Sequence, residues 1–434
     1  MSEPDRLIAC HECAAIYRRA PIPENARANC LRCGALLYRH IPDSLNRSLA
    51  LYLAALMLWI MANLFPFLGL KVGEIYQENL LLQAGLALYE HGMGELGLVV
   101  FLTSILFPLI TIVGMIYLLL PLRFGFVPAQ TGRVFQIIGA LLPWSLISVF
   151  MLGTLIAIVK LQDLATVVPG FSLVAFSLLL VVYAMADSHF DRADFWDEVE
   201  RLRGTDSQPR QLSGSALLHH CHVCDGIQEG GHHCRRCGCE VHHRVTDSIQ
   251  QTWAFLFAAV LMLIPANLYP VMTVKKLGAG QPDTILSGVI HLLEAGLYGL
   301  GFIVLFASII VPVAKLLTLG FLLYSVQKRS AWKPRDRTQL YRVTEIVGSW
   351  SMVDVFLVGL LAGLVSLGLL ASVTPGIGAS FFGAAVILTM LAAQKFDPRL
   401  IWDNLPDTDV TASRTGKADN PADAGAALDG MQTS

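Results

Sequence analysis

Eight apolar stretches alternate with polar segments along the chain, and each is long enough to cross a bilayer as a helix. The sequence predicts these spans near residues 49–69, 96–120, 134–160, 170–187, 251–272, 298–326, 344–372 and 376–394. The segment from Lys71 to Glu95 is more polar, and within it Leu80–Tyr89 is expected to form an interfacial or partly re-entrant helix. The pattern indicates a polytopic α-helical membrane protein.

The same order of segments occurs twice, so the chain is a tandem repeat. Each copy begins with two Cys-x2-Cys pairs, and the first span ends thirty residues later in Asn-Leu-Phe-Pro (63–66) or Asn-Leu-Tyr-Pro (267–270). Other positions match in register: Glu90 with Glu294, Pro108 with Pro312, Trp144-Ser145 with Trp350-Ser351, and Pro169-Gly170 with Pro375-Gly376. Because each half has four spans, both halves are expected to enter the membrane from the same side.

These patterns divide the chain into six segments. We expect a first cysteine module (1–48), a first four-helix module (49–189), a polar linker (190–216), a second cysteine module (217–248), a second four-helix module (249–396) and a C-terminal tail (404–434). The tail is rich in Ala, Asp, Gly and Thr and has no apolar period, which is typical of disorder.

Composition agrees with a membrane protein, because 54% of the residues are hydrophobic and only 15% are charged. The net charge of −2 gives no reason to expect nucleic-acid binding. The first forty residues contain charges and cysteines in place of an apolar core, so we expect no cleaved signal peptide.

The distribution of basic residues predicts the orientation of the spans. Six of them lie near the connection between the second and third spans of the second half: Lys328, Arg329, Lys333, Arg335, Arg337 and Arg342. The opposite side has few, although Lys275 and Lys276 run against the trend. We therefore expect both termini and both cysteine modules to be cytoplasmic.

The cysteine pairs predict two structural metal sites of the zinc-ribbon (rubredoxin-like) kind. In the first module, sixteen residues separate the two Cys-x2-Cys pairs, which is within the range for structural zinc. Gly34, after the last cysteine, suits the tight turn of a zinc knuckle. The eight expected ligands, for two zinc ions, are Cys10, Cys13, Cys30, Cys33, Cys221, Cys224, Cys234 and Cys237. Iron, disulfides and reduced thiols without metal are the alternatives.

The second cysteine module departs from the first in two ways. Only nine residues separate its pairs, and it holds many histidines together with a ninth cysteine, Cys239. The sequence leaves open whether a histidine or Cys239 replaces one of the four cysteine ligands.

Two charged residues lie inside predicted spans of the second half only. Lys315 follows Pro312 in one span and Asp354 lies in the next, whereas the first half has Thr111 and Ser148 at these positions. Because an unpaired charge in a membrane is costly, we expect Lys315 and Asp354 to pair, with Ser351 and Thr389 nearby as a polar network. The alternative to a transport role is a structural salt bridge. Glu90 and Glu294 are expected either to line a lipid headgroup path or to be solvated at the interface.

The chain has two cysteine ribbons, each followed by four spans, and the first span of each half ends in Asn-Leu-Phe-Pro or Asn-Leu-Tyr-Pro. This arrangement resembles the paraquat-inducible protein A family and its LetA branch. The likeness extends to about Asp403. It implies a multi-pass protein of the inner membrane of a Gram-negative bacterium. It also implies a partner, a hexameric periplasmic MCE tunnel protein that carries phospholipid between membranes, and it favours a transport role for the polar network.

The chain contains no Walker-type nucleotide motif and no evident hydrolytic Ser, His and Asp set, so we expect no enzyme. Three hypotheses remain. The chain transfers phospholipid to a periplasmic tunnel, or it is a membrane redox protein that uses Cys-x2-Cys dithiols, or it only anchors an assembly. Bound zinc would exclude thiol cycling, and lipid movement would separate the first hypothesis from the third.

Overall fold

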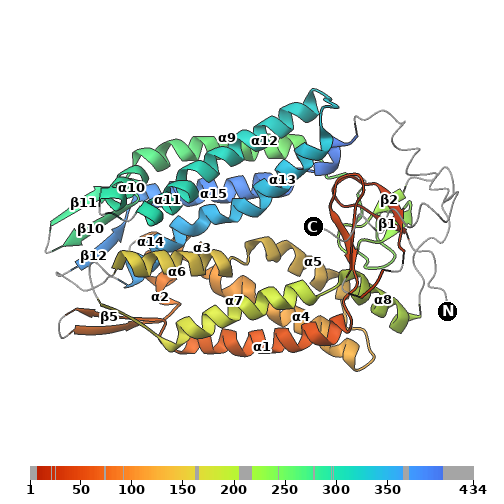
Figure 1. Ribbon diagram of the computed structural model, residues 1–434, viewed down its shortest axis with the longest axis horizontal. Coiled ribbons are helices and arrows are strands. Elements are labelled where there is room, and N and C mark those ends of the chain that lie inside the picture. The colour runs from red at the N-terminus through yellow and green to blue at the C-terminus, as the bar shows by residue number, and fades with distance from the viewer. Residues whose placement is uncertain are drawn as a thin grey trace.

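The fold was analysed in a computed structural model, which describes residues 7–20, 22–24, 26–72, 75–90, 92–161, 166–204, 218–242, 244–276, 279–294, 296, 298–364 and 371–403. The long helices run roughly side by side between two dissimilar ends (Figure 1). Small β-sheets lie at one end, here called the sheet end, and the cysteine modules lie at the other, here called the ribbon end. The predicted tail and residues 205–217 of the predicted linker lie outside the described residues.

The eight predicted spans are confirmed, because the described residues contain eight helices long and apolar enough to cross a membrane. In the first half they are α1 (Ser44–Leu64), α3 (Gly94–Phe101) continuing into α4 (Phe107–Arg123), α5 (Thr131–Leu141) continuing into α6 (Ile147–Leu161), and α7 (Phe171–His189). In the second half they are α9 (Ser248–Leu268), α11 (Tyr298–Leu305) with α12 (Val311–Gln327), α13 (Pro334–Gly348) with α14 (Val353–Leu364), and α15 (Ile377–Lys395).

The seventh span begins earlier than the apolar pattern indicates, at Pro334 instead of near residue 344. A proline in the first turn and the acidic Asp336 both favour a helix start. As a result Arg335, Arg337 and Arg342, which the hydropathy pattern assigned to the connection, lie on α13.

Two spans in each half are irregular at matched positions. A π-helical turn occupies Leu102–Leu106 before Pro108, and another occupies Phe306–Ile310 before Pro312. Proline has no N–H and crowds the preceding turn, which explains these bulges. The third spans break at 3-10 turns, Leu142–Trp144 and Ser349–Met352.

Each Asn-Leu-aromatic-Pro motif packs the first span of its half against the fourth. The carbonyl of Pro66 accepts a hydrogen bond from Ser172, and that of Pro270 accepts one from Gly378. A Cβ atom at Gly170 would overlap the Pro66 oxygen, and one at Gly376 would overlap the Pro270 oxygen. The matched Pro-Gly pairs therefore allow the chain to pass close to the end of the first span.

The sequence analysis missed a three-stranded sheet that follows the first span in each half. In the first, β5 (Leu68–Val72) lies between β6 (Ile75–Asn79) and β7 (Thr166–Pro169). In the second, β10 (Met272–Lys276) lies between β11 (Ala279–Asp283) and β12 (Ala371–Pro375). Each hairpin leads into a short helix, α2 (Gln83–Glu90) or α10 (Ile285–Glu294), and α2 is the helix expected at Leu80–Tyr89.

Helix α14 joins the two halves. Every residue from Val353 to Gly363 is buried, because α14 packs against α2, α3 and α6 of the first half as well as α15 of its own. The rings of Phe150 and Phe356 meet edge to face, 5.5 Å apart, at the contact between α6 and α14.

The predicted linker contains a helix. Residues Arg192–Arg203 form α8, in which Phe195 and Trp196 are fully buried against Phe135 of α5. The apolar positions in an otherwise charged segment explain why it docks on the first half instead of remaining extended.

Candidate functional site

Four Cys-x2-Cys knuckles with the same local structure build the two cysteine modules. The first module also contains the hairpins β1 (Leu7–Ala9) with β2 (Ile16–Arg18) and β3 (Arg27–Asn29) with β4 (Leu36–Arg39), and the second contains β8 (Leu218–His220) with β9 (Ile227–Glu229). After the second cysteine of each knuckle the backbone is left-handed, at Ala14, Gly34, Asp225 and Gly238. The amide of that residue donates to the carbonyl of the first cysteine, which turns both thiols toward one point.

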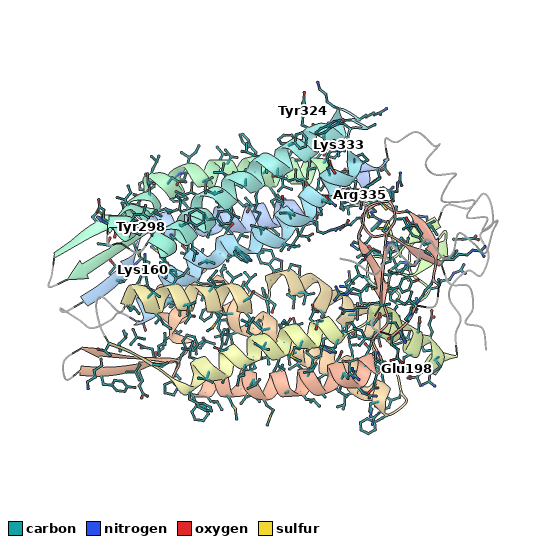
Figure 2. The ribbon with its side chains drawn as sticks, in the orientation of Figure 1. Lys160, Glu198, Tyr298, Tyr324, Lys333 and Arg335 are labelled. Atoms are coloured by element: carbon teal, nitrogen blue, oxygen red, sulfur yellow. The ribbon has the colours of Figure 1, made fainter. Side chains whose placement is uncertain are left out.

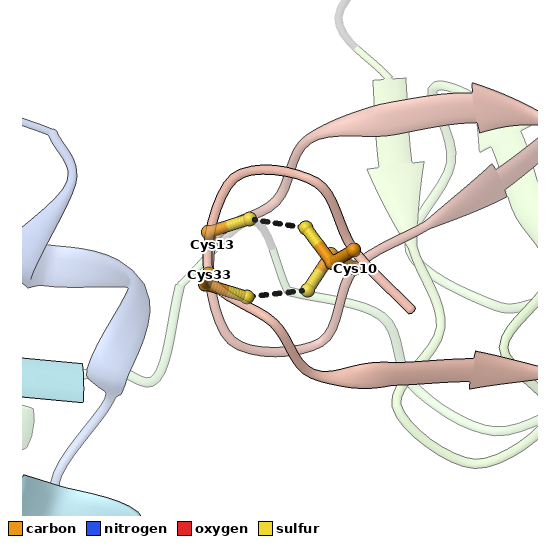
Figure 3. A group of neighbouring side chains, drawn as sticks. Cys10, Cys13 and Cys33 are labelled. Atoms are coloured by element: carbon orange, nitrogen blue, oxygen red, sulfur yellow. Dashed lines mark hydrogen bonds between the residues drawn. The ribbon is translucent and has the colours of Figure 1, made fainter. Parts of the chain in front are cut away.

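The four sulfur atoms of each module lie within 4.8 Å of one another. In the first module the Sγ atoms of Cys10 and Cys33 are 3.4 Å apart, and those of Cys13 and Cys30 are 3.5 Å apart (Figure 3). A disulfide would require about 2.05 Å. Four ligands about 2.3 Å from one ion, by contrast, would be about 3.8 Å apart in a tetrahedron. The nine cysteines are free thiols, and the geometry fits two metal ions.

The environment of these thiols lowers the pKa of Cys10 and Cys30 in the first module and of Cys234 in the second, which favours deprotonation there. Hydrogen bonds from Cys10 and Cys13 lower the pKa of the Cys30 thiol. Hydrogen bonds from Cys221 and Cys224 lower the pKa of Cys234 in the same way. A thiolate is the form that binds metal.

In the second module, the candidate ligands are the four predicted cysteines. The Cys239 thiol lies outside the cluster and donates to the carbonyl of Gly132, 3.6 Å away. No described histidine joins either cluster, and His220 instead pairs with Asp225 at 3.4 Å. His243 lies outside the described residues.

The knuckles of each cysteine module dock on the opposite half. In the first module, Glu12 accepts two hydrogen bonds from Arg342 of α13, and Arg32 lies 4.6 Å from the ring centre of Trp402. In the second module, Arg236 binds Asp197 at 2.7 Å and Glu200 at 3.0 Å, both on α8 of the first half. The knuckles therefore cross over to the opposite half, while Arg19 and Arg244 bind Asp197 and Asp403 of their own half. Each cysteine module thus braces the two membrane modules together.

Lys315 caps the helix end at the break in the seventh span. Its Nζ donates to the carbonyl of Gly348, at the end of α13, and to Thr389 Oγ1 of α15, at 3.2 and 3.1 Å. All three groups are buried. A helix end leaves carbonyls without partners and carries partial negative charge, so an ammonium group is well suited to this position. Gly348 permits the approach, because a Cβ atom there would lie 2.8 Å from Nζ.

The expected Lys315–Asp354 pair does not form. No ion pair joins these two residues, both of which are described, and Asp354 interacts instead with Ser308 and with Lys160 of α6. Ser351 is buried and its hydroxyl has no partner among the described residues. The reason is the rotation of the helices: Lys315 is directed to Gly348 and Thr389, whereas Asp354 lies beside Ser308 and within electrostatic range of Lys160. Lys160 lies toward the sheet end (Figure 2).

Repeat register gives the first-half counterparts of the Lys315 group (Lys315, Gly348 and Thr389) as Thr111, Leu142 and Tyr183. Thr111 donates a hydrogen bond to the carbonyl of Phe107 in its own helix, 2.9 Å away. The sequence analysis missed Gly348 and Lys160. The signal for Lys160 was a cation near the end of a predicted span, and the carboxylate whose charge acts on it, Asp354, lies in the other half of the chain.

Glu90 and Glu294 lie apart from this group. They end α2 and α10, and both are exposed. Glu294 is 3.6 Å from His291 of the same helix. Solvated glutamates match this exposure, and their use in a lipid path stays a prediction.

Comparison with known proteins places these features in a family. The family model described as "Paraquat-inducible protein A" matches residues 45–200 and again 249–406. The chain is 31% identical to "Intermembrane transport protein PqiA" of Escherichia coli K12 over 93% of this chain and 97% of the relative. It is 30% identical to "Lipophilic envelope-spanning tunnel protein A" of the same strain, over 91% and 90%. A Haemophilus influenzae relative, "Probable intermembrane transport protein", is 29% identical over 92% and 97%. No solved structure matches.

Proposed function

The chain belongs to the paraquat-inducible protein A family, and on that premise we propose that it passes phospholipid between the inner membrane of a bacterium and a periplasmic MCE tunnel protein. Two observations support the proposal. Relatives that cover nearly the whole chain are named for intermembrane transport and for a tunnel that spans the envelope. The eight spans also enclose buried charged groups that a purely structural bundle does not require.

The observation that carries the proposal is the Lys315 group. A lysine buried at a helix break, held by one carbonyl and one hydroxyl, needs little rearrangement to exchange a partner. A phosphate group of a lipid is the partner of opposite charge that a membrane supplies. We assign Lys315 and Thr389 to the moving part of the transporter, and Asp354 with Lys160 to the contact between halves.

Structural zinc in both cysteine clusters is part of the proposal. The closest sulfur pairs join different Cys-x2-Cys motifs, which argues against dithiols that cycle within one motif. Zinc would hold the crossed modules in place, because the binding energy of a structural zinc ion is folding energy. The basic residues at the ribbon end favour a cytoplasmic position for both modules.

Complementation of an envelope-sensitive deletion strain tests the transport role, with protein levels measured in parallel. We expect Lys315→Met to accumulate to at least half the wild-type level and to lose complementation at least tenfold. Thr111→Val is the matched control at the first-half position and should complement fully. Full complementation by Lys315→Met at normal abundance would contradict the proposed role of this lysine.

A further inference from the structure

A large cavity lies at the ribbon end of the first membrane module, away from the Lys315 group. Its volume is about 1210 Å³, and it is open to solvent on one side. It is lined by the start of α1, the end of α4, helix α8 and the segment 38–43 that leads from the first cysteine module into α1. Glu198, one of its lining residues, lies at the ribbon end beside α1 (Figure 2). Ligand pockets commonly have volumes of about 300–1,000 Å³, so there is room for more than water.

The membrane-facing side of the cavity is apolar. Leu45 and Leu49 line it from α1, and Leu119 and Leu122 line it from α4. These leucines lie in the terminal turns of two spans, at the depth where acyl chains join a headgroup. A ligand with an aliphatic part is therefore favoured over a wholly polar one.

The polar side carries charges of both signs. Four arginines and five carboxylates line the cavity. Two of the four arginines are already paired, since Arg19 binds Asp197 at 2.8 Å and Arg201 binds Glu198. Three of the five carboxylates are also paired, because Arg236 binds Glu200 at 3.0 Å. Asp43 and Asp194 then remain with Arg39 and Arg123, and this balance favours a ligand with charges of both signs over one of net negative charge.

Two lining groups are left available for a ligand. Arg123, at the end of α4, is exposed and makes no hydrogen bond or ion pair with any described residue. Asp194 has only a 3.6 Å contact with Arg19, which binds Asp197 more closely. One free cation and one poorly compensated carboxylate thus lie in the same cavity as the leucines, within the part of the chain that the structure describes.

We propose that this cavity binds a zwitterionic phospholipid with a primary-amine headgroup, taken from the leaflet at the ribbon end. The phosphate would bind Arg123, the ammonium would bind Asp194, and the first methylenes of the acyl chains would contact Leu119 and Leu122. The site is separate from the Lys315 group and goes beyond the proposed transfer step, because it assigns both a lipid class and a leaflet.

Electrostatics at Asp194 agree with an ammonium ligand. Burial and the negative charge of Asp191 raise the pKa of Asp194 to about 6. A cation in the cavity would relieve both effects.

The test uses the purified full-length chain in detergent micelles that contain equal amounts of phosphatidylethanolamine and phosphatidylglycerol, with native mass spectrometry to count bound lipids. We expect the wild type to retain phosphatidylethanolamine at least threefold over phosphatidylglycerol. Equal retention, or a preference for phosphatidylglycerol, would overturn the proposal. This comparison needs no variant, so it is decisive even where a variant misfolds.

Variants then locate the site. Arg123→Gln should lower phosphatidylethanolamine retention at least threefold, and Asp194→Asn should abolish the preference over phosphatidylglycerol. Lys328→Gln, which removes an exposed cation at the matching end of α12, is the control and should bind as the wild type does. Retention unchanged by both Arg123→Gln and Asp194→Asn would refute the site.

Two further arms distinguish a lipid in this cavity from a soluble phosphate ligand and from a lipid at the Lys315 group. Soluble glycerophosphoethanolamine in excess should not displace the lipid, and displacement would show a headgroup site for soluble phosphates instead. Lys315→Met should retain phosphatidylethanolamine as the wild type does, so a failure of the transport proposal leaves the lipid result intact. Loss of retention in Lys315→Met would place the bound lipid at the Lys315 group and reject the cavity.

Discussion

Lys315 and Asp354 illustrate how two buried charges in neighbouring spans can have unrelated roles. Lys315 completes the hydrogen bonding of a broken helix, and Asp354 interacts with Ser308 and with the charge of Lys160. A charge that satisfies a helix end is stabilising in its own right, so its removal affects the break and not a partner carboxylate.

Stability measurements distinguish this arrangement from an ion pair. Lys315→Met should lower the free energy of unfolding by about 1–3 kcal/mol, because the Gly348 carbonyl loses its buried donor. Asp354→Asn should add to this loss independently, as expected for residues that do not share an interaction. Thermal unfolding of the single and double variants in detergent provides the measurement. Recovery of stability in the double variant would show that the two residues are coupled.

The cysteine clusters predict the metal content of the protein. We expect close to two zinc ions per chain, measured by elemental analysis of the purified protein. Cys33→Ser should reduce the metal content to about one ion and lower abundance, since metal binding is coupled to folding. Cys239→Ser is a matched control, because this thiol is buried beside Gly132 and outside the cluster, and it should retain both ions. Normal abundance of Cys33→Ser with one ion would show that the site is not structural.

The Asp194 carboxyl predicts a dependence of stability on pH. Its pKa is about 6 in the native protein and about 3.8 for an isolated group, so the native state binds more protons between these values. The contribution of this carboxyl group to the free energy of unfolding therefore falls as the pH rises from about 4 to above 6. Asp194→Asn removes this titration. In lipid-free detergent, the melting temperature of the variant minus that of the wild type should therefore increase as the pH rises over that range. Parallel curves for the two proteins would contradict the shift.

At the scale of elements, the Asn-Leu-aromatic-Pro motif acts as a clamp between the first and fourth spans of each half. Asn63 and Asn267 each donate to the carbonyl one turn earlier, at Trp59 and Leu263, which completes the final turn of the span. The proline then turns the chain into the first strand of a sheet, and its carbonyl bonds the start of the fourth span.

Glycine substitutions test the clamp. Gly376→Ala should destabilise the protein by about 2 kcal/mol or more, because the added methyl group overlaps the Pro270 carbonyl. Gly139→Ala, in α5, is the control, since a Cβ there meets no described atom within 4 Å, and it should be neutral or stabilising by up to about 1 kcal/mol. Melting temperatures compare the two. Similar values for both variants would mean that the fourth span can move away from the motif.

At the scale of the whole molecule, the crossed cysteine modules make the two halves interdependent. A chain split between residues 204 and 218 should therefore reassemble when both pieces are co-expressed, and a tag on one piece should recover the other. Glu12→Arg should reduce that recovery because it places like charges against Arg342. Adding Arg342→Glu should restore part of it. Equal recovery in all three cases would show that the contact of Glu12 with Arg342 is not needed to hold the halves together.

Much of the structure of this protein can be predicted from local patterns in the sequence. The repeat, the eight spans and the two clusters of four cysteines were predicted correctly, because span length, hydropathy and the spacing of thiols are properties of contiguous sequence. The helix at Gln83–Glu90 follows in the same way. By contrast, the strands β7 and β12 join sheets whose other strands lie about a hundred residues earlier, and short strands leave little periodic signal.

Contacts between distant segments depend on the three-dimensional structure. Hydropathy places Lys315 and Asp354 at a depth in the membrane. The rotation of each helix about its axis decides that Lys315 bonds Gly348 and Thr389 and that Asp354 lies beside Ser308. The docking of the cysteine modules also depends on the three-dimensional structure, because two similar ribbons could each dock on either half. The contact of Glu12 with Arg342, and of Arg236 with Asp197 and Glu200, favours the crossed arrangement.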